Sequence, residues 1–153
     1  MDQHNKPIPA PQDVAKQFEI GFDCSQVVAE YFAEDMGLSV EDARKVAACF
    51  GGGCGKGGTC GAVVGAMMAI GMKCGQCDAD HMEQKDVMQQ KQGAFFDAFA
   101  EVHGSSLCRD LLGHDISKPG EFEKVLEEGT MMTLCPRIVS ESIRMTRTIL
   151  EEG

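Results

Sequence analysis

The chain has 153 residues and eight cysteines, and its 24 acidic and 14 basic residues give a formal net charge of −10 at pH 7. This length corresponds to about one domain with a single hydrophobic core. We expect that domain to cover residues 11–153 and a polar, Pro-rich lead to cover residues 1–10. The negative charge argues against nucleic acid or an anionic membrane as a partner. It suits a basic protein partner, and the alternative is an acidic surface that is simply solvated.

No segment has the pattern of a secretory signal or a membrane span. The N-terminal residues lack an apolar stretch. The longest apolar run, residues 62–72, contains glycines and is far shorter than the ~20 residues that cross a bilayer. Without a signal, eight cysteines indicate metal or redox ligands rather than a secreted disulfide framework. We therefore expect a cytoplasmic protein.

Helix signals dominate the chain, and strand signals are nearly absent because no segment alternates apolar and polar residues for long. N-cap residues before apolar residues at helical spacing, and glycines where a helix would stop, predict the boundaries. Asp23, Ser39 and Thr59 are expected N-caps. The expected helices cover residues 11–20, 24–36, 40–50, 60–72, 79–103, 107–112, 120–128 and 136–151.

Residues 51–58 are expected to form a loop, because their glycines make a helix interior unfavourable. The elements together predict an all-α, single-domain helical bundle with this glycine-rich loop at its cysteine-bearing end. Small residues in the 60–72 helix predict a close helix–helix contact, and they are Ala62, Gly65, Ala66 and Ala69. The expected core contacts of the two longest helices are Met82, Val87, Met88, Phe95, Phe96, Phe99, Ile138, Val139, Ile143 and Ile149.

Four cysteines each lie where a helix is expected to begin, and they are Cys24, Cys60, Cys108 and Cys135. A helix N-terminus presents free N–H groups and the positive end of the helix dipole, which should lower the pKa of a thiol. Thiolate is the form that binds metals and exchanges with disulfides. Four cysteines in this position therefore predict a metal or redox site.

Connection lengths indicate which cysteines can meet. The 24–36 and 40–50 helices are joined by a short connection and should be antiparallel, which brings the glycine loop back to Cys24. The 60–72 helix then carries the chain about 20 Å away, and the 79–103 helix returns it. We expect the four cysteines at helix starts to converge, with Cys135 placed there as the economical choice. Cys74 and Cys77 should lie at the far end.

The other motifs in the chain are weaker evidence for a function. Gly53-x-Gly55-x-x-Gly58 matches a dinucleotide-binding fingerprint, but that motif requires a preceding strand. Cys74-Gly-Gln-Cys77 lacks the βαβ context of a thioredoxin-type dithiol, and Asp78 stands where a c-type haem motif needs histidine. Two histidines beside Cys108 could be ligands, or could have loop or capping roles: His103 and His114. Four cysteines are accessory candidates whose alternative is to be inert thiols: Cys49, Cys54, Cys74 and Cys77.

The ordered pattern of these motifs resembles a known family of cysteine-rich, redox-active proteins labelled C_GCAxxG_C_C. The resemblance runs from about Gly21 to Ile149 and rests on Cys24-Ser-Gln-Val, Phe50-Gly-Gly-Gly, Thr59-Cys60-Gly-Ala-Val-Val-Gly65, Cys108-Arg-Asp-Leu-Leu-Gly113 and Cys135-Pro136. The label writes Gly-Cys-Ala where this chain reads Cys60-Gly61-Ala62. Family members look like small helical proteins, and a related domain occurs in a multihaem cytochrome that also carries an iron–sulfur cluster. The resemblance implies that Cys24, Cys60, Cys108 and Cys135 are the functional set.

The leading hypothesis is an electron-transfer protein that holds an iron–sulfur cluster on those four thiolates, because converging helix N-termini offset the negative charge of such a centre. A thiol–disulfide redox protein or sensor that uses the same cysteines is the first alternative. A structural zinc site is the second. No general base, nucleophile triad or substrate pocket stands out, so an electron-transfer or redox-accessory role is favoured over an enzyme. A basic redox protein is the expected partner, and a homodimer remains open.

Overall fold

The computed structural model describes residues 6–152, and within them it is all-α with no β-strand. The chain folds as a single domain. No helix in the described range is long and apolar enough to cross a membrane. The helices are α1 (Pro11–Glu19), α2 (Cys24–Tyr31), α3 (Val40–Ala47), α4 (Gly61–Cys74), α5 (Met82–His103), α6 (Cys108–Leu112), α7 (Glu121–Glu128), α8 (Thr130–Thr133) and α9 (Cys135–Glu151).

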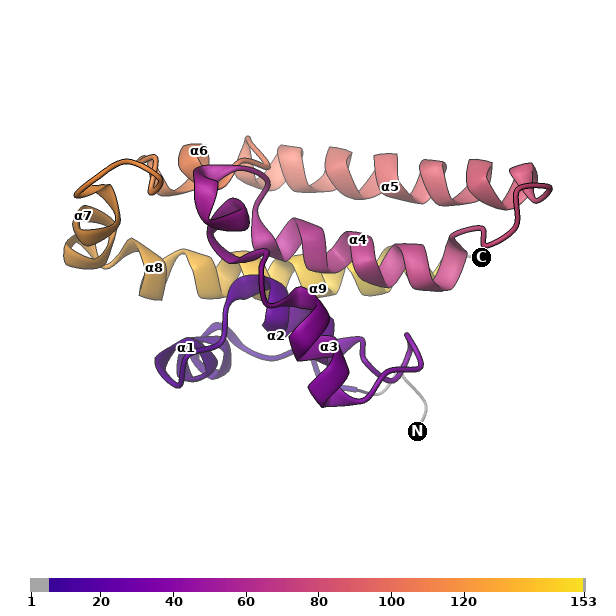
Figure 1. Ribbon diagram of the computed structural model, residues 1–153, viewed down its shortest axis with the longest axis horizontal. Coiled ribbons are helices and arrows are strands. Elements are labelled where there is room, and N and C mark those ends of the chain that lie inside the picture. Colours follow the sequence, from indigo (N-terminus) through magenta and orange to yellow (C-terminus); the bar gives the residue numbers. More distant parts are fainter. Residues whose placement is uncertain (1–5, 153) are drawn as a thin grey trace.

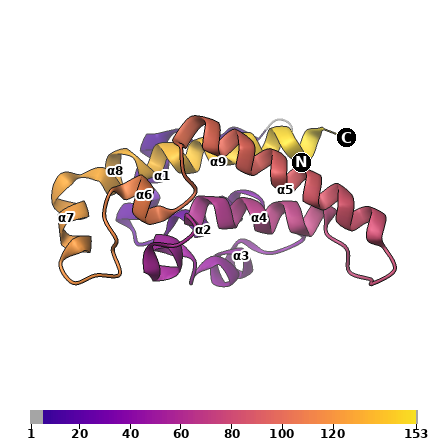
Figure 2. The same ribbon diagram turned by 90° about the horizontal axis from the view of Figure 1, so that it is seen from above.

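Three helices, α4, α5 and α9, run side by side along the long axis of the molecule (Figures 1 and 2). In Figure 1, α1, α2 and α3 lie along one side of this layer, and α2 contacts both α4 and α9. The short helices α6, α7 and α8 lie toward one end, and the α4–α5 corner lies at the other. The start of α4 and the end of α5 therefore face the short helices.

The core of the three-helix layer contains most of the apolar residues expected from the sequence. Phe95 and Phe99 are buried and stack with their ring centroids 5.8 Å apart. The expected residues of the last helix are also buried, and they are Ile138, Val139, Ile143 and Ile149. The prediction for Met82 and Val87 was wrong, since they are 53% and 44% exposed. In both views the start of α5 extends past the ends of α4 and α9, and Met82 is the first residue of this helix.

Several helix boundaries differ from the expected ones. The second helix ends at Tyr31 rather than near residue 36, because the chain tightens into turns there: the Ala33 N–H donates to the carbonyl of Glu30, only three residues back, at 3.2 Å. The third helix ends at Ala47, and the short helix α8 was not expected. The Ser39 cap is confirmed, since its hydroxyl accepts from the Asp42 N–H at 3.0 Å.

The small-residue face of α4 is buried, as expected. Gly65 is the tightest point of its contact with α2: a Cβ atom added there would lie 2.7 Å from the Cβ of Val28 and 3.2 Å from the Ser25 carbonyl oxygen. Real Cβ atoms do not approach neighbours at the first of these distances. The absence of a side chain at Gly65 therefore determines how close α2 lies to α4.

Candidate functional site

Four cysteines from four separate segments line one small cavity of about 20 Å³. Cys24 begins α2, Cys60 is the N-cap of α4, Cys108 begins α6 and Cys135 begins α9. The rest of the lining is nonpolar, namely Gly52, Gly61, Leu111, Leu112 and Ile138. The predicted convergence of these cysteines is confirmed, including that of Cys135. Their role as ligands stays a prediction.

A short backbone pairing between two loops places Cys60 beside Cys108. The Cys60 N–H donates to the Ser106 carbonyl at 2.7 Å, and the Cys108 N–H donates to the Gly58 carbonyl at 2.7 Å. Thr59 and Leu107 form an isolated antiparallel bridge between the two loops. The prediction that Thr59 caps the helix was wrong, since Cys60 is the N-cap and Thr59 lies in this bridge. A bridge of one residue leaves no periodic sequence signal that could have revealed it.

Gly61 allows Cys24 to lie against the first turn of α4. A Cβ atom at Gly61 would lie 3.3 Å from the Cβ of Cys24 and 3.1 Å from the backbone N of Ser25. Directly before Cys24, the backbone N–H of Asp23, the N-cap of α2, donates a hydrogen bond to Gln26 Oε1 at 2.9 Å. Glycine directly after Cys60 thus brings two of the four thiols together.

The glycine-rich loop forms a single wide turn over Gly53–Gly57. Four consecutive residues, Gly52, Gly53, Cys54 and Gly55, have left-handed backbone with φ of 65°, 62°, 60° and 68°. This conformation costs an L-residue about 1–2 kcal/mol, whereas glycine adopts it freely. The run of glycines therefore permits the turn that places Gly52 on the cavity wall.

The four accessory cysteines do not line the cavity. Cys49, Cys54 and Cys77 are exposed, and Cys74 is half-buried at the end of α4 opposite Cys60. The predicted remote position of Cys74 and Cys77 is confirmed. All eight cysteines are free thiols. Within residues 6–152, no three His, Cys, Asp or Glu side chains are arranged to hold a single metal ion.

The pKa values of three cavity thiols are raised, which contradicts the expectation that helix starts lower them. Burial is the main cause for Cys60 and Cys108, and it raises their pKa values to about 11 and about 12. The backbone N–H groups of Ala62 and Val63, in the first turn of α4, do lower the pKa of Cys60 as expected, but burial outweighs them. Repulsion between neighbouring thiolates adds to the increase.

Cys24 and Cys135 form a hydrogen-bonded pair within the cavity. The Cys24 thiol donates to the Cys135 sulfur, which raises the pKa of Cys24 well above its ordinary value and lowers the pKa of Cys135. Burial and the other three cysteines raise the pKa of Cys24 further. Cys135 is therefore the cavity cysteine that most readily becomes a thiolate.

An apolar pocket of about 250 Å³ adjoins three of the four cysteines, Cys24, Cys108 and Cys135. Its walls come from the α1–α2 corner and from α6, α7 and α8. The remaining lining residues are Phe18, Gly21, Phe22, Asp23, Gly52, Leu112, Leu126, Met131 and Met132. This pocket was not anticipated from the sequence, because the expected elements did not indicate how α7 and α8 pack against the α1–α2 corner.

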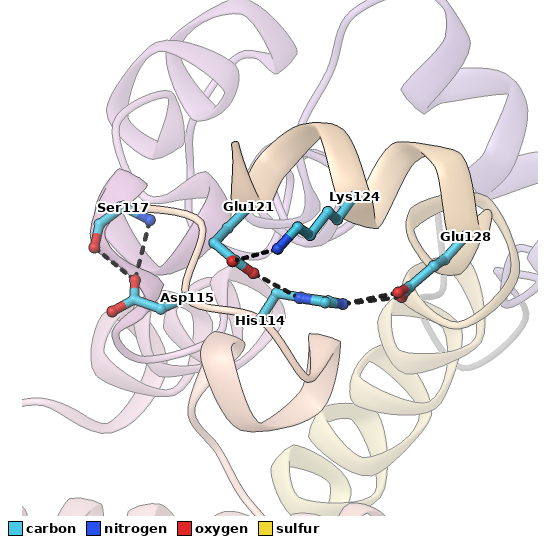
Figure 3. Close-up of polar contacts among 6 residues, drawn as sticks. All are labelled: His114, Asp115, Ser117, Glu121, Lys124 and Glu128. Atoms are coloured by element: carbon cyan, nitrogen blue, oxygen red, sulfur yellow. Dashed lines mark hydrogen bonds and ion pairs between the residues drawn. The ribbon is translucent and has the colours of Figure 1, made fainter. Parts of the chain in front are cut away.

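Both histidines beside Cys108 interact with glutamates and do not line the cavity. His103 Nε2 lies 2.9 Å from Glu141 Oε2. His114 is bonded at both ring nitrogens, with Nδ1 2.7 Å from Glu121 and Nε2 3.0 Å from Glu128 (Figure 3). Since these two glutamates lie at opposite ends of α7, His114 joins the chain after α6 to the whole length of α7.

We expect His114 to make the stability of the protein depend on pH. Its hydrogen bonds to Glu121 and Glu128 raise its pKa in the folded state. The resulting stabilisation is fully present below the unfolded-state pKa of about 6.5 and is lost as pH rises through the folded-state pKa. Urea unfolding across this range should show that the stability advantage of the wild type over His114→Gln is largest at low pH and declines as pH rises. Parallel curves for the wild type and His114→Gln would contradict the assignment.

The fold and the cavity define a small all-α protein with a buried four-cysteine centre assembled from four helical segments. The chain belongs to the family described as "Putative redox-active protein (C_GCAxxG_C_C)", whose match covers residues 22–149 and includes all four cavity cysteines. Comparisons with curated proteins and with solved structures each find no match. Membership of this family supports a redox role for the protein.

Proposed function

We propose that the protein transfers electrons through an iron–sulfur cluster held by Cys24, Cys60, Cys108 and Cys135. The observation that carries this proposal is the lining of one cavity by four thiols from separate segments. Four cysteine thiolates are the usual ligand set of [2Fe–2S] and [4Fe–4S] clusters, so the donor chemistry fits. When bound, such a cluster supplies one-electron transfer.

The surrounding residues suit a buried anionic centre. The N–H groups of Ala62 and Val63 act on the Cys60 sulfur, and N–H groups directed at ligand sulfurs raise the reduction potential of a cluster. Leu111, Leu112 and Ile138 give the cavity an apolar wall. The cavity alone has room for about one water molecule. The adjoining 250 Å³ pocket offers the further space that a cluster core needs.

Ligation requires the cavity thiols to lose protons. Because burial raises the pKa values of Cys60 and Cys108 to about 11 and about 12, both are protonated at neutral pH without a metal. Metal binding must release these protons, so affinity should increase as pH rises. Cys135, whose pKa is lowered, is the natural first ligand.

A second candidate is a dithiol–disulfide couple between Cys24 and Cys135, favoured by their direct hydrogen bond. Formation of the disulfide removes two electrons and two protons from the pair, and an oxidising disulfide partner would accept them. The thiolate of Cys135 would attack that partner's disulfide, and the Cys24 sulfur would then attack the mixed disulfide and release the partner's second thiol.

Anaerobic reconstitution with ferrous iron and sulfide distinguishes the candidates. We expect a brown protein with visible charge-transfer absorption, stoichiometric iron and acid-labile sulfide, and an electron paramagnetic resonance signal in one oxidation state. A colourless protein that forms a Cys24–Cys135 disulfide on mild oxidation, identified by peptide mapping, would favour the second candidate. A colourless protein with one tightly bound zinc per chain would contradict both and indicate a structural metal site.

A further inference from the structure

We propose that the opening of the apolar pocket is the docking surface for a basic redox protein whose own apolar cofactor edge is ringed by lysine or arginine side chains. This inference rests on the proposed electron-transfer function. The pocket opens at the surface of the protein and is lined in part by Cys24, Cys108 and Cys135. A partner seated on it would approach the four-cysteine centre more closely than one bound at the α4–α5 corner.

Exposed apolar side chains gather around this opening. Leu126 and Met132 line the pocket and are 50% and 38% exposed. Phe122, 40% exposed, lies one turn before Leu126 on the same face of α7. Ile20, 69% exposed, directly precedes Gly21 of the pocket wall. Figures 1 and 2 both place the end of α1 and the helices α7 and α8 toward the same end of the molecule. We call these four residues the mouth surface.

Clustered apolar exposure with a charged border is typical of an interaction site. Of the ten large apolar side chains that stand out as exposed in residues 6–152, four belong to the mouth surface. Its position over three of the cavity thiols distinguishes it from the exposed group at the start of α5. The mouth surface therefore has both the composition of an interface and a connection to the redox centre.

The helix α7, which carries Phe122 and Leu126 of the mouth surface, is negatively charged. The helix α7 carries four glutamates and one lysine, which gives it a formal charge of −3. Glu123 and Glu127 are exposed, whereas Glu121 and Glu128 bind His114 (Figure 3). Glu19 and Asp23 add further acidic groups at the α1–α2 corner. Such a border attracts a basic face, and it repels a second copy of a chain that itself carries −10.

Docking can be measured without electron transfer. We would titrate protein labelled with ¹³C at its methionine methyl groups with zinc-substituted cytochrome c, a basic protein with a lysine-ringed porphyrin edge. The methyl signals of Met131 and Met132 should shift. Those of Met72 and Met82, which are 56% and 53% exposed at the other end of α4 and α5, should not. The shifts should weaken between about 10 and about 200 mM salt, because salt screens exposed charges.

Two double charge-reversal variants change the net charge of the protein equally but at different places. Comparing them distinguishes an effect of the charges beside the mouth surface from an effect of the total charge. Glu123→Lys with Glu127→Lys should weaken binding about fivefold or more. Glu83→Lys with Asp86→Lys, at the far end of α5, should weaken it much less. Equal weakening by both, shifts at Met72 and Met82 instead, or no shift at all would overturn the proposal. So would concentration-dependent shifts of Met131 and Met132 without cytochrome c, because the mouth surface would then join two copies of the chain. If the protein binds cytochrome c at the mouth surface but does not bind iron, the proposed iron–sulfur function would be wrong and the docking proposal would still hold.

Discussion

Cys60→Ser should lose the visible absorption and bound iron of the reconstituted protein, whereas Cys77→Ser should retain both. Serine has nearly the same size as cysteine, but its weakly acidic hydroxyl is a poor ligand for the iron of a cluster, which is otherwise held by soft thiolates. Cys60 is only 6% exposed and its backbone is held by the hydrogen bond to Ser106, so no neighbouring cysteine can easily replace it. Iron content and absorption at matched protein concentration provide the measurement.

The control is closely matched, because Cys77 is a free thiol remote from the cavity. Circular dichroism of both apoproteins should be unchanged, since the serine hydroxyl at position 60 can accept from the same first-turn N–H groups as the thiol. Equal loss of iron in the two variants would show that the site is elsewhere. Full retention of iron in Cys60→Ser would remove Cys60 from the ligand set.

Gly65→Ala should lower the free energy of unfolding by about 1–3 kcal/mol, because its new methyl group would overpack the α2–α4 contact. The added carbon would lie 2.7 Å from the Cβ of Val28, and that atom cannot move without moving α2. The substitution should also weaken cluster binding, since α2 carries Cys24 and α4 carries Cys60. Urea unfolding and iron content measure the two effects.

Gly71→Ala in the same helix is the matched control. A Cβ atom at Gly71 would meet nothing within 4 Å. Alanine is better than glycine in a helix interior by about 1 kcal/mol, so this variant should be slightly more stable than the wild type. If both substitutions changed stability in the same direction and by the same amount, helix propensity rather than packing would explain Gly65.

The arrangement of the four cysteines could be predicted because it follows from helix starts and helix lengths. Asp23 before Cys24 and Pro136 after Cys135 mark two of those starts, and the length of α4 separates Cys60 from Cys74. The pairing of Thr59 with Leu107 could not be predicted, because it depends on two loops meeting after the helices have packed.

The thiol pKa values could not be predicted for a related reason. The helix N-terminus acts on Cys60 through Ala62 and Val63, as local reasoning suggests. Burial is set by residues distant in sequence, such as Leu112 and Ile138 on the cavity wall, and it has the larger effect. The exposure of Met82 likewise depends on where α4 and α9 end, which the spacing within α5 does not indicate.

The distribution of the four cysteines along the chain also bears on how the protein unfolds. They lie at the starts of α2, α4, α6 and α9, so a group bound to all four would cross-link segments from residue 24 to residue 135. Cross-links that close long loops restrict the unfolded chain most. The segment most dependent on such a link is α6, a helix of five residues that is too short to be stable alone. Loss of the bound group should therefore destabilise α6 first. Amide hydrogen exchange should then be faster in α6 while the other helices keep their protection.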